Sequence, residues 1–370
     1  MTKKRLDYLD IAKGIGIILI VMGHTGLVAP DFVQWLSNTF HMALFFIISG
    51  MLIALKKEEE RPFTDTCIKK CKQLLTPYFI FCALNIILII KERIEGLAIN
   101  ECYDMVFVRL IQTFTLSGIS VLWFLPALLA AELIFVAILQ RTKKSSKIVK
   151  FLIWSAIIAV IITIFSCMNP SRGEFDVNGE WGLYFFENII EACLHTIFAF
   201  FFLIIGYSIQ GLLENIKNRA VFSRYGFLWI IALLCMSKLL KLYTSRFNTI
   251  EDLNNLNIEN PVFFVVNSII GTVFILCLSA IIAYIPIIKN LFVYCGKNSL
   301  IIMITHLDCY VLLIALKLEK VLSQYLPSNL VDASYFVVMV IALVLEVVII
   351  TITNRFFPFV LGKKLNARKS

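Results

Sequence analysis

The sequence predicts an all-α integral membrane protein, a bundle of about ten transmembrane helices that form one domain over residues 1–370. Composition is the first reason: 59% of the residues are hydrophobic and 16% are charged, whereas about a quarter of a typical soluble domain is charged. The second reason is a mean hydropathy of +0.86. The third is a series of apolar runs near the ~20 residues that a helix needs to cross a bilayer. Together they exclude an assembly of water-soluble domains.

Short polar connections separate these apolar runs along the chain. The expected spans, in order, are 11–29, 40–55, 74–90, 121–139, 148–167, 188–211, 225–243, 262–285, 298–316 and 333–353. The first run follows basic residues as a signal peptide would, but Lys13 and His24 interrupt it and no clean cleavage site follows. We therefore expect it to remain as an uncleaved helix.

The basic residues are distributed unevenly between the connections. If the N-terminus is cytoplasmic, the connections on that side hold 24 of the 34 Lys and Arg residues, those on the other side hold 9, and Lys13 lies inside the first span. The positive-inside rule then predicts that both termini are cytoplasmic in a multi-pass protein of the cell (inner or plasma) membrane. The formal charge of +9 reflects this topology and attraction to anionic membrane lipids, so no nucleic-acid partner is expected.

The ten cysteines are scattered and form no Cys-x-x-Cys pair. Cys67 and Cys71 share a cytoplasmic connection that contains no histidine, so we expect no metal site there. Most of the cysteines are interpreted as small apolar residues that fill space in the bundle.

All four histidines fall within the predicted spans or at their edges: His24, His41, His195 and His306. An ionisable group inside a bilayer costs free energy and usually has a function. A single buried histidine is often only a packed, hydrogen-bonded residue, and that reading stays open for each of them. Because no histidine is left for the polar connections, we interpret the set as candidates for chemistry.

The first span carries Asp10, Lys13 and His24 on one face. From Lys13 to His24 the helix turns through about 1100°, close to three full turns, and rises about 16 Å. Asp10 and Lys13 are three residues apart and can form an ion pair; Asp10 can also be a simple interfacial anchor. The span thus combines charge at its cytoplasmic end with an imidazole near its outer end.

Further candidates follow along the chain. His41 opens the second span from the outer side and is expected level with His24. Glu187, Glu191 and His195 are spaced by four and share a helix face, although both carboxylates can also lie in the outer interface. Two acidic residues, Glu132 and Glu346, lie at depth without an assigned role.

Lys69 and Lys72 stand three residues apart on the cytoplasmic side. On a helix they point the same way, which suits a polyanionic cytosolic ligand such as a nucleotide or coenzyme A. The alternative is an ordinary basic loop of the positive-inside kind.

Four segments together carry a resemblance to a known family. They are Leu9–Ile17 continuing to Val21–His24, Phe40–Gly50, Trp123–Leu128, and Gly296–Leu300 continuing to His306. In these segments the chain resembles the membrane acyltransferase 3 family, in particular its branch of fucose or exopolysaccharide O-acetyltransferases. The segments occur in the expected order, and the resemblance spans essentially the whole chain.

The resemblance implies a transmembrane transferase. Such an enzyme takes an acyl group, commonly acetyl, from cytosolic acyl-CoA and passes it to a hydroxyl of a glycan or lipid-linked sugar at the outer side. Acetyl-CoA is then a co-substrate, and no permanently bound cofactor is expected. The family's basic residue and histidine match Lys13 and His24, and its basic pair matches Lys69 and Lys72. Lys stands where many members have Arg, and it lacks the bidentate fork of Arg.

Acyl transfer to a hydroxyl needs a base, an oxyanion donor and a bound thioester. We expect His24 to be the base, with His41 as its partner or as the oxyanion donor, and Asp10 counts with them as a catalytic candidate. Lys13, Lys69 and Lys72 are expected to hold the acyl-CoA phosphates. The candidates for binding the acceptor are Trp123, Glu187, Glu191, His195 and His306.

Two other classes of protein remain open from the sequence. Intramembrane Glu and His with a basic cytoplasmic face also suit a proton-coupled transporter or flippase of a lipid-linked sugar. Many carriers have internal repeats, and none is found in this chain. A non-catalytic membrane sensor is the third possibility.

Overall fold

The computed structural model describes residues 7–25, 31–94, 99–146, 181–217, 261–322 and 334–363, with the single residues 154, 157, 160, 161, 238, 256 and 324. Within these ranges the chain is helical and contains no strand. It divides into two compact units. Unit 1 comprises 1–48, 209–252 and 258–352; unit 2 comprises 49–208, 253–257 and 353–370.

In the described part of the chain, five helical segments are long and apolar enough to cross a membrane. They are Phe63–Lys91, Ser120–Thr142, Trp181–Gln210, Phe264–Ile282 and Ser334–Phe356. A bent pair, Pro286–Lys297 with Ser299–Leu307, makes a sixth if it counts as one span. The chain is thus a multi-pass helical protein. The number ten and the cytoplasmic termini stay predictions, because most of the expected spans 225–243 and 148–167 lies outside the described residues.

The expected ninth span, 298–316, is not one continuous helix. Helix α11 (Ser299–Asp308) ends before Tyr310, which has a left-handed backbone with φ 57°, and α12 (Val311–Leu322) begins after it. At its other end, α11 is bent by 69° from α10 (Pro286–Lys297). Each break is only one or two residues long and has apolar residues on both sides, so a hydropathy average over a whole span does not resolve it.

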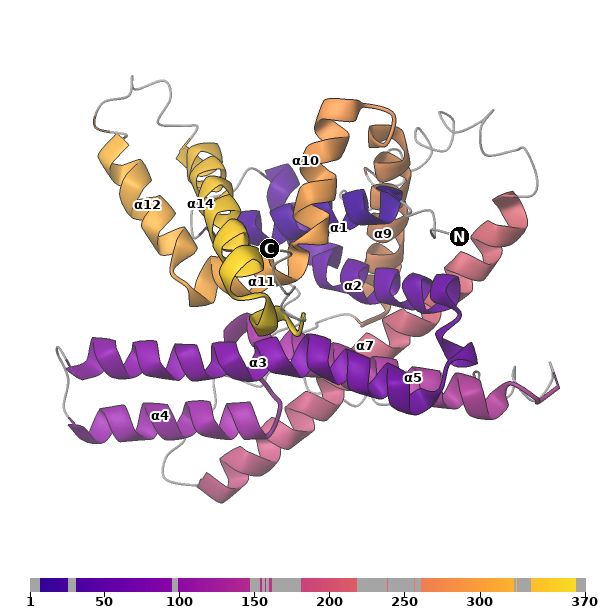
Figure 1. Cartoon of the computed structure of the whole chain (residues 1–370), viewed down its shortest axis with the longest axis horizontal. Helices are drawn as coiled ribbons and strands as arrows, with labels where there is room; N and C mark the ends of the chain where they lie inside the picture. Colours follow the sequence, from indigo (N-terminus) through magenta and orange to yellow (C-terminus); the bar gives the residue numbers. More distant parts are fainter. Residues whose placement is uncertain are drawn as a thin grey trace, which may run out of the picture. The chain divides into compact units, whose positions relative to one another are not determined.

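Close backbone contact between α1 (Asp7–Gly23) and α10 organises unit 1 (Figure 1). A Cβ at Gly14 would overlap the carbonyl oxygen of Phe292, and one at Gly296 would overlap that of Asp10. Small residues therefore let the two backbones touch, as is common between membrane helices. Helix α9 (Pro261–Ile282) also packs on α1.

The C-terminal end of α1 is held by a second helix of unit 1. In α14 (Ser334–Phe356), the Tyr335 hydroxyl donates a hydrogen bond of 2.8 Å to the carbonyl oxygen of Met22. The bond joins residues that are 313 positions apart in the chain. It fixes the end of the helix just before His24.

The central helix of unit 2 is α3 (Phe63–Ile94). It contacts both α4 (Ile99–Phe114) and α5 (Phe124–Thr142), and it runs alongside α4 (Figure 1). The Tyr78 hydroxyl lies 3.2 and 3.0 Å from the carbonyl oxygens of Gln112 and Thr113 on α4. Two short helices, η1 (Glu58–Glu60) and η3 (Pro358–Leu361), pack on α5 and α3 respectively.

Helices α2 (Asp31–Lys56) and α7 (Trp181–Lys217) meet at a glycine within unit 2. A Cβ at Gly50 would overlap the carbonyl oxygen of Leu203. The sequence Ser49-Gly50 therefore permits close helix approach.

Candidate functional site

Three of the four histidines come together in unit 1. His24 directly follows α1, His41 lies in α2, and His306 lies in α11. The ring centroids of His24 and His306 are 5.2 Å apart, with an edge-to-face angle of 68°. His41 and His306 each interact electrostatically with His24. The structure thus brings together three imidazoles that are far apart in the sequence.

The hydrogen bonds of two of these rings fix their tautomers. The Nδ1 of His24 lies 2.8 Å from the carbonyl oxygen of Ile20, and the Nδ1 of His306 lies 2.9 Å from that of Ile302. A carbonyl oxygen only accepts, so each Nδ1 donates and each Nε2 presents its lone pair. Both histidines therefore have a nitrogen that can accept a hydrogen bond.

The two rings differ in accessibility. His24 is exposed, whereas His306 is 0% exposed. The Nε2 of His306 and the Nδ1 of His41 are buried and have no hydrogen-bond partner among the described residues. A buried polar nitrogen without a partner costs free energy, so both nitrogens are suited to a hydrogen bond with a ligand, and the Nε2 of His306 would accept it.

A buried carboxyl group lies beside this cluster. The Thr305 hydroxyl, next to His306, is 2.9 and 2.7 Å from the two carboxyl oxygens of Glu346 on α14. It is also 2.8 Å from the carbonyl oxygen of Ile301. Glu346 is 1% exposed. This contact joins α11 to α14 at the residue before His306, and Thr305 was not among the residues predicted from the sequence.

The expected ion pair at the start of α1 is present. The Lys13 ammonium lies 3.1 Å from Asp10 Oδ1, and Asp10 is buried. Asp10 is fourteen residues before His24, about 21 Å along the helix at 1.5 Å per residue. The structure therefore does not bring Asp10 to the imidazoles.

In unit 2, His195 of α7 stacks on Trp123 at the end of η2 (Ser120–Trp123). The ring centroids are 4.2 Å apart with an angle of 24°, and both rings are buried. Glu187 and Glu191 are half-buried on the same helix. The stacked rings cover each other, so the carboxylates are the more accessible part of this predicted group.

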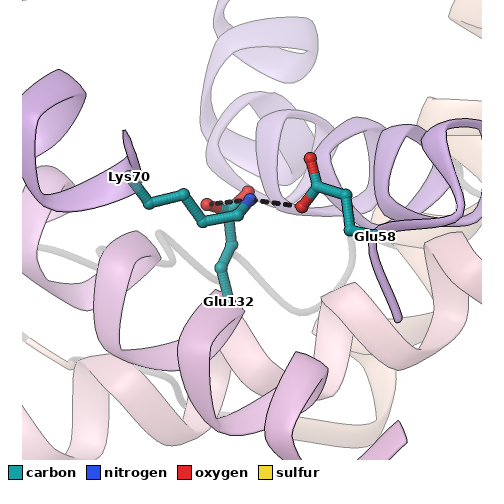
Figure 2. A network of polar contacts seen from close by, with 3 residues as sticks. All are labelled: Glu58, Lys70 and Glu132. Carbon is teal, nitrogen blue, oxygen red and sulfur yellow. Dashed lines mark hydrogen bonds and ion pairs between the residues drawn. The ribbon is translucent and has the colours of Figure 1, made fainter. Parts of the chain in front are cut away.

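Lys69 and Lys72 on α3 are both exposed, as an anion site requires. Lys70, between them, is buried. Its ammonium lies 2.8 Å from Glu58 Oε2 on η1 and 2.9 Å from Glu132 Oε2 on α5 (Figure 2). The sequence interpretation overlooked Lys70 and Glu58. Two signals in the sequence point to this ion pair. Helical phase turns Lys70 away from Lys69 and Lys72, and Glu132 in an apolar span needs a cation as its partner.

The described residues contain no group of three His, Cys, Asp or Glu side chains that could hold a metal ion. The chemistry that this part of the structure offers is proton transfer at imidazoles and anion binding at lysines.

Comparison with known proteins gives one match. A family model described as an acyltransferase domain matches residues 6–355. No curated protein and no solved structure shows a significant match.

Proposed function

The chain belongs to this acyltransferase family, and on that premise we propose that it moves an acetyl group from cytosolic acetyl-CoA to a hydroxyl of a cell-surface or lipid-linked glycan. The apolar helices make it a multi-pass membrane acyltransferase. The acetyl donor, the glycan acceptor and the residue roles that follow belong to the proposal.

The main support for the proposal is the hydrogen bonding and the exposure of the His24 ring. Its Nδ1 is held by the carbonyl oxygen of Ile20, its Nε2 presents a lone pair, and the side chain is exposed. A general base needs this combination, because it must reach the substrate proton with a free nitrogen. We assign His24 as the base and His41 as its partner.

The proposed acetyl transfer needs no reactant other than the acetyl-CoA donor and the acceptor hydroxyl. The acceptor hydroxyl gives its proton to Nε2 of His24, and its oxygen forms a bond to the thioester carbonyl carbon. The carbon–sulfur bond then breaks, and the coenzyme A thiolate takes up the proton from the imidazolium. The products are the O-acetyl ester and free coenzyme A.

We assign Lys69 and Lys72 to the phosphate groups of the donor. Both residues of the pair are exposed and three positions apart on α3. Ammonium groups bind phosphate as point charges and not through a bidentate fork. Salt is therefore expected to weaken donor binding.

For the acceptor we assign Glu187 and Glu191, whose carboxylates accept hydrogen bonds from sugar hydroxyls. Trp123 and His195, stacked on each other, would shape the region around them. In unit 1, His306 lies beside His24, and we assign its buried Nε2 to a hydroxyl of the acceptor.

The test compares cells that lack the gene with cells that carry the wild-type or the His24→Ala protein at equal membrane levels. Mass spectrometry of surface glycans should find acetyl esters only with the wild type. Purified wild-type protein in nanodiscs should also release coenzyme A from acetyl-CoA when those glycans are added. Glycans that are identical with and without the gene would contradict the proposal, and full activity of His24→Ala would contradict the assignment of the base.

A further inference from the structure

Apolar packing does little to fix the rotation of α3 about its own axis. In the most apolar stretch of Phe63–Lys91, 22% of the residues are buried, compared with 67% for the corresponding stretch of Ser120–Thr142. In that stretch the helix is apolar on nearly all sides and mostly unburied, so it gains little from one rotation over another. Specific polar contacts must therefore select the rotation.

Lys70 makes the strongest of these contacts. Its ammonium is shared between Glu58 at 2.8 Å and Glu132 at 2.9 Å, and the three side chains are at most 10% exposed (Figure 2). The partners come from η1 and α5, two elements that are separate from α3. Removing Lys70 would leave two buried carboxylates without this cation, which is strongly unfavourable.

The direction of Lys70 determines the direction of its neighbours. At about 100° per residue, Lys69 and Lys72 lie about 60° apart, and their common direction is about 130° away from Lys70. Burial agrees with this geometry, because Lys70 is 8% exposed and both other lysines are exposed. When Lys70 is drawn inward, the pair is turned outward.

Two further contacts are consistent with a fixed rotation. Lys56, at the end of α2, interacts electrostatically with both carboxylates and with Lys69 and Lys70. After η3, Gly362 has a left-handed backbone with φ 62°, and a Cβ there would overlap the carbonyl oxygen of Lys72. The stretch of α3 that carries the lysine pair is thus held from several sides within unit 2.

We propose that Lys70 is a positioning residue, whose ion pairs with Glu58 and Glu132 hold α3 in the rotation that presents Lys69 and Lys72 together to the phosphate groups of acyl-CoA. The inference rests on the proposed function for its ligand. An ion group that only stabilised the fold would not affect KM for acyl-CoA in a folded variant.

The test is a charge exchange, measured with the full-length protein in nanodiscs and acetyl-CoA as the donor. Lys70→Glu puts three carboxylates together, and Glu132→Lys puts two ammonium groups beside one carboxylate. The double variant restores one lysine between two glutamates. We expect each single variant to raise KM for acetyl-CoA roughly tenfold or more with little change in kcat. The exchange should return KM to within about threefold of the wild-type value.

Glu132→Gln serves as a milder variant in case the single charge reversals fail to fold. It keeps the size of the side chain and leaves Glu58 to pair with Lys70. Its KM should rise less than that of Glu132→Lys while the protein stays folded. An exchange variant with wild-type thermal stability but a KM that stays high would overturn the positioning role, as would single variants that lower only kcat.

A second measurement reports on rotation without any substrate. Cys71, next to Lys70, is half-buried, and its Sγ lies 3.9 Å from that of Cys67. A turn of α3 changes the access of reagents to Cys71. Its alkylation rate, followed by mass spectrometry of the α3 peptide, should change in the single variants and return in the exchange. An unchanged rate in all variants would overturn the inference.

The two proposals fail in distinguishable ways. If Lys72→Ala leaves KM for acetyl-CoA unchanged, the donor site of the proposed function is wrong, whatever Cys71 reports. If Lys72→Ala raises KM but the Lys70 variants change neither KM nor the Cys71 rate, the donor site stands and the positioning role is wrong.

Discussion

His24 and His306 meet edge to face with ring centroids 5.2 Å apart, and each ring hydrogen-bonds through Nδ1 to the carbonyl oxygen four residues before it. His24 directly follows α1, and His306 lies in the last turn of α11. One open nitrogen is at an exposed position and the other is buried. The pair therefore offers two hydrogen-bond acceptors, one exposed and one buried. This fits a general base at His24 beside an acceptor-binding residue at His306.

The first prediction concerns His306→Phe. Phe keeps a ring that can pack against His24, but it removes the buried Nε2. Because an unpartnered buried polar atom costs about 1–3 kcal/mol, we expect thermal stability to be unchanged or higher. KM for the glycan acceptor should rise roughly tenfold, the effect of one lost hydrogen bond. Unchanged acceptor kinetics would mean that His306 only packs against its neighbours.

The second prediction concerns the contact between Thr305 and Glu346. Thr305→Val keeps the shape of the side chain but removes the hydroxyl that meets both carboxyl oxygens. We expect a loss of about 1–3 kcal/mol in the free energy of unfolding, since the carboxyl group is left buried without this partner. Thr305→Ser is the matched control and should retain most of the stability. Equal thermal unfolding of Val and Ser variants would show that the contact contributes nothing.

Hydropathy predicted several helices well. The expected spans 121–139, 262–285 and 333–353 correspond to Phe124–Thr142, Pro261–Ile282 and Ser334–Phe356. It missed the helices Ile99–Phe114 and Pro286–Lys297 and the break between α11 and α12. A break of one or two residues is averaged with its apolar neighbours, so it leaves little trace in a hydropathy value taken over a whole span. The position of a turn such as the one at Tyr310 depends on packing that the average does not contain.

The site was predictable where a residue type stood out from its surroundings. Histidines in apolar runs are conspicuous, and unit 1 does bring His24, His41 and His306 together. Lys70 was hidden among other lysines of a basic segment. Its partner Glu132 is 62 residues away, and one sequence gives no means of pairing residues at that distance. Helical phase could separate Lys70 from its neighbours, but only the fold identifies its partners.

The third prediction concerns the contact between α1 and α10. Gly14→Ala places a Cβ against the carbonyl oxygen of Phe292, a backbone atom that no side-chain rotation can move. We expect destabilisation by about 1–3 kcal/mol, typical of overpacking. Gly182→Ala is the control, because nothing lies within 4 Å of a Cβ at that position. Both variants are compared by thermal unfolding in the same detergent, and equal midpoints would contradict the close contact.

The fourth prediction tests the charge of Lys72 against that of Lys91, a second exposed lysine of the same helix. Each is replaced by Ala, so the two variants lose the same charge from α3. The residues are nineteen positions apart, about 28 Å along the helix, which is well beyond the screening length of about 10 Å at 0.1 M salt. Only Lys72→Ala should raise KM for acetyl-CoA.

Turnover and salt dependence make this prediction specific. Phosphate contacts bind the ground state and the transition state alike, so kcat of Lys72→Ala should stay near the wild-type value. Added salt should raise KM of the wild type and of Lys91→Ala, and it should raise KM of Lys72→Ala less, because one of the screened charges is already gone. Equal KM values for both variants at low salt would show that the lysines near the start of α3 serve topology alone. A fall in kcat with unchanged KM would instead indicate that Lys72 acts in the chemical step.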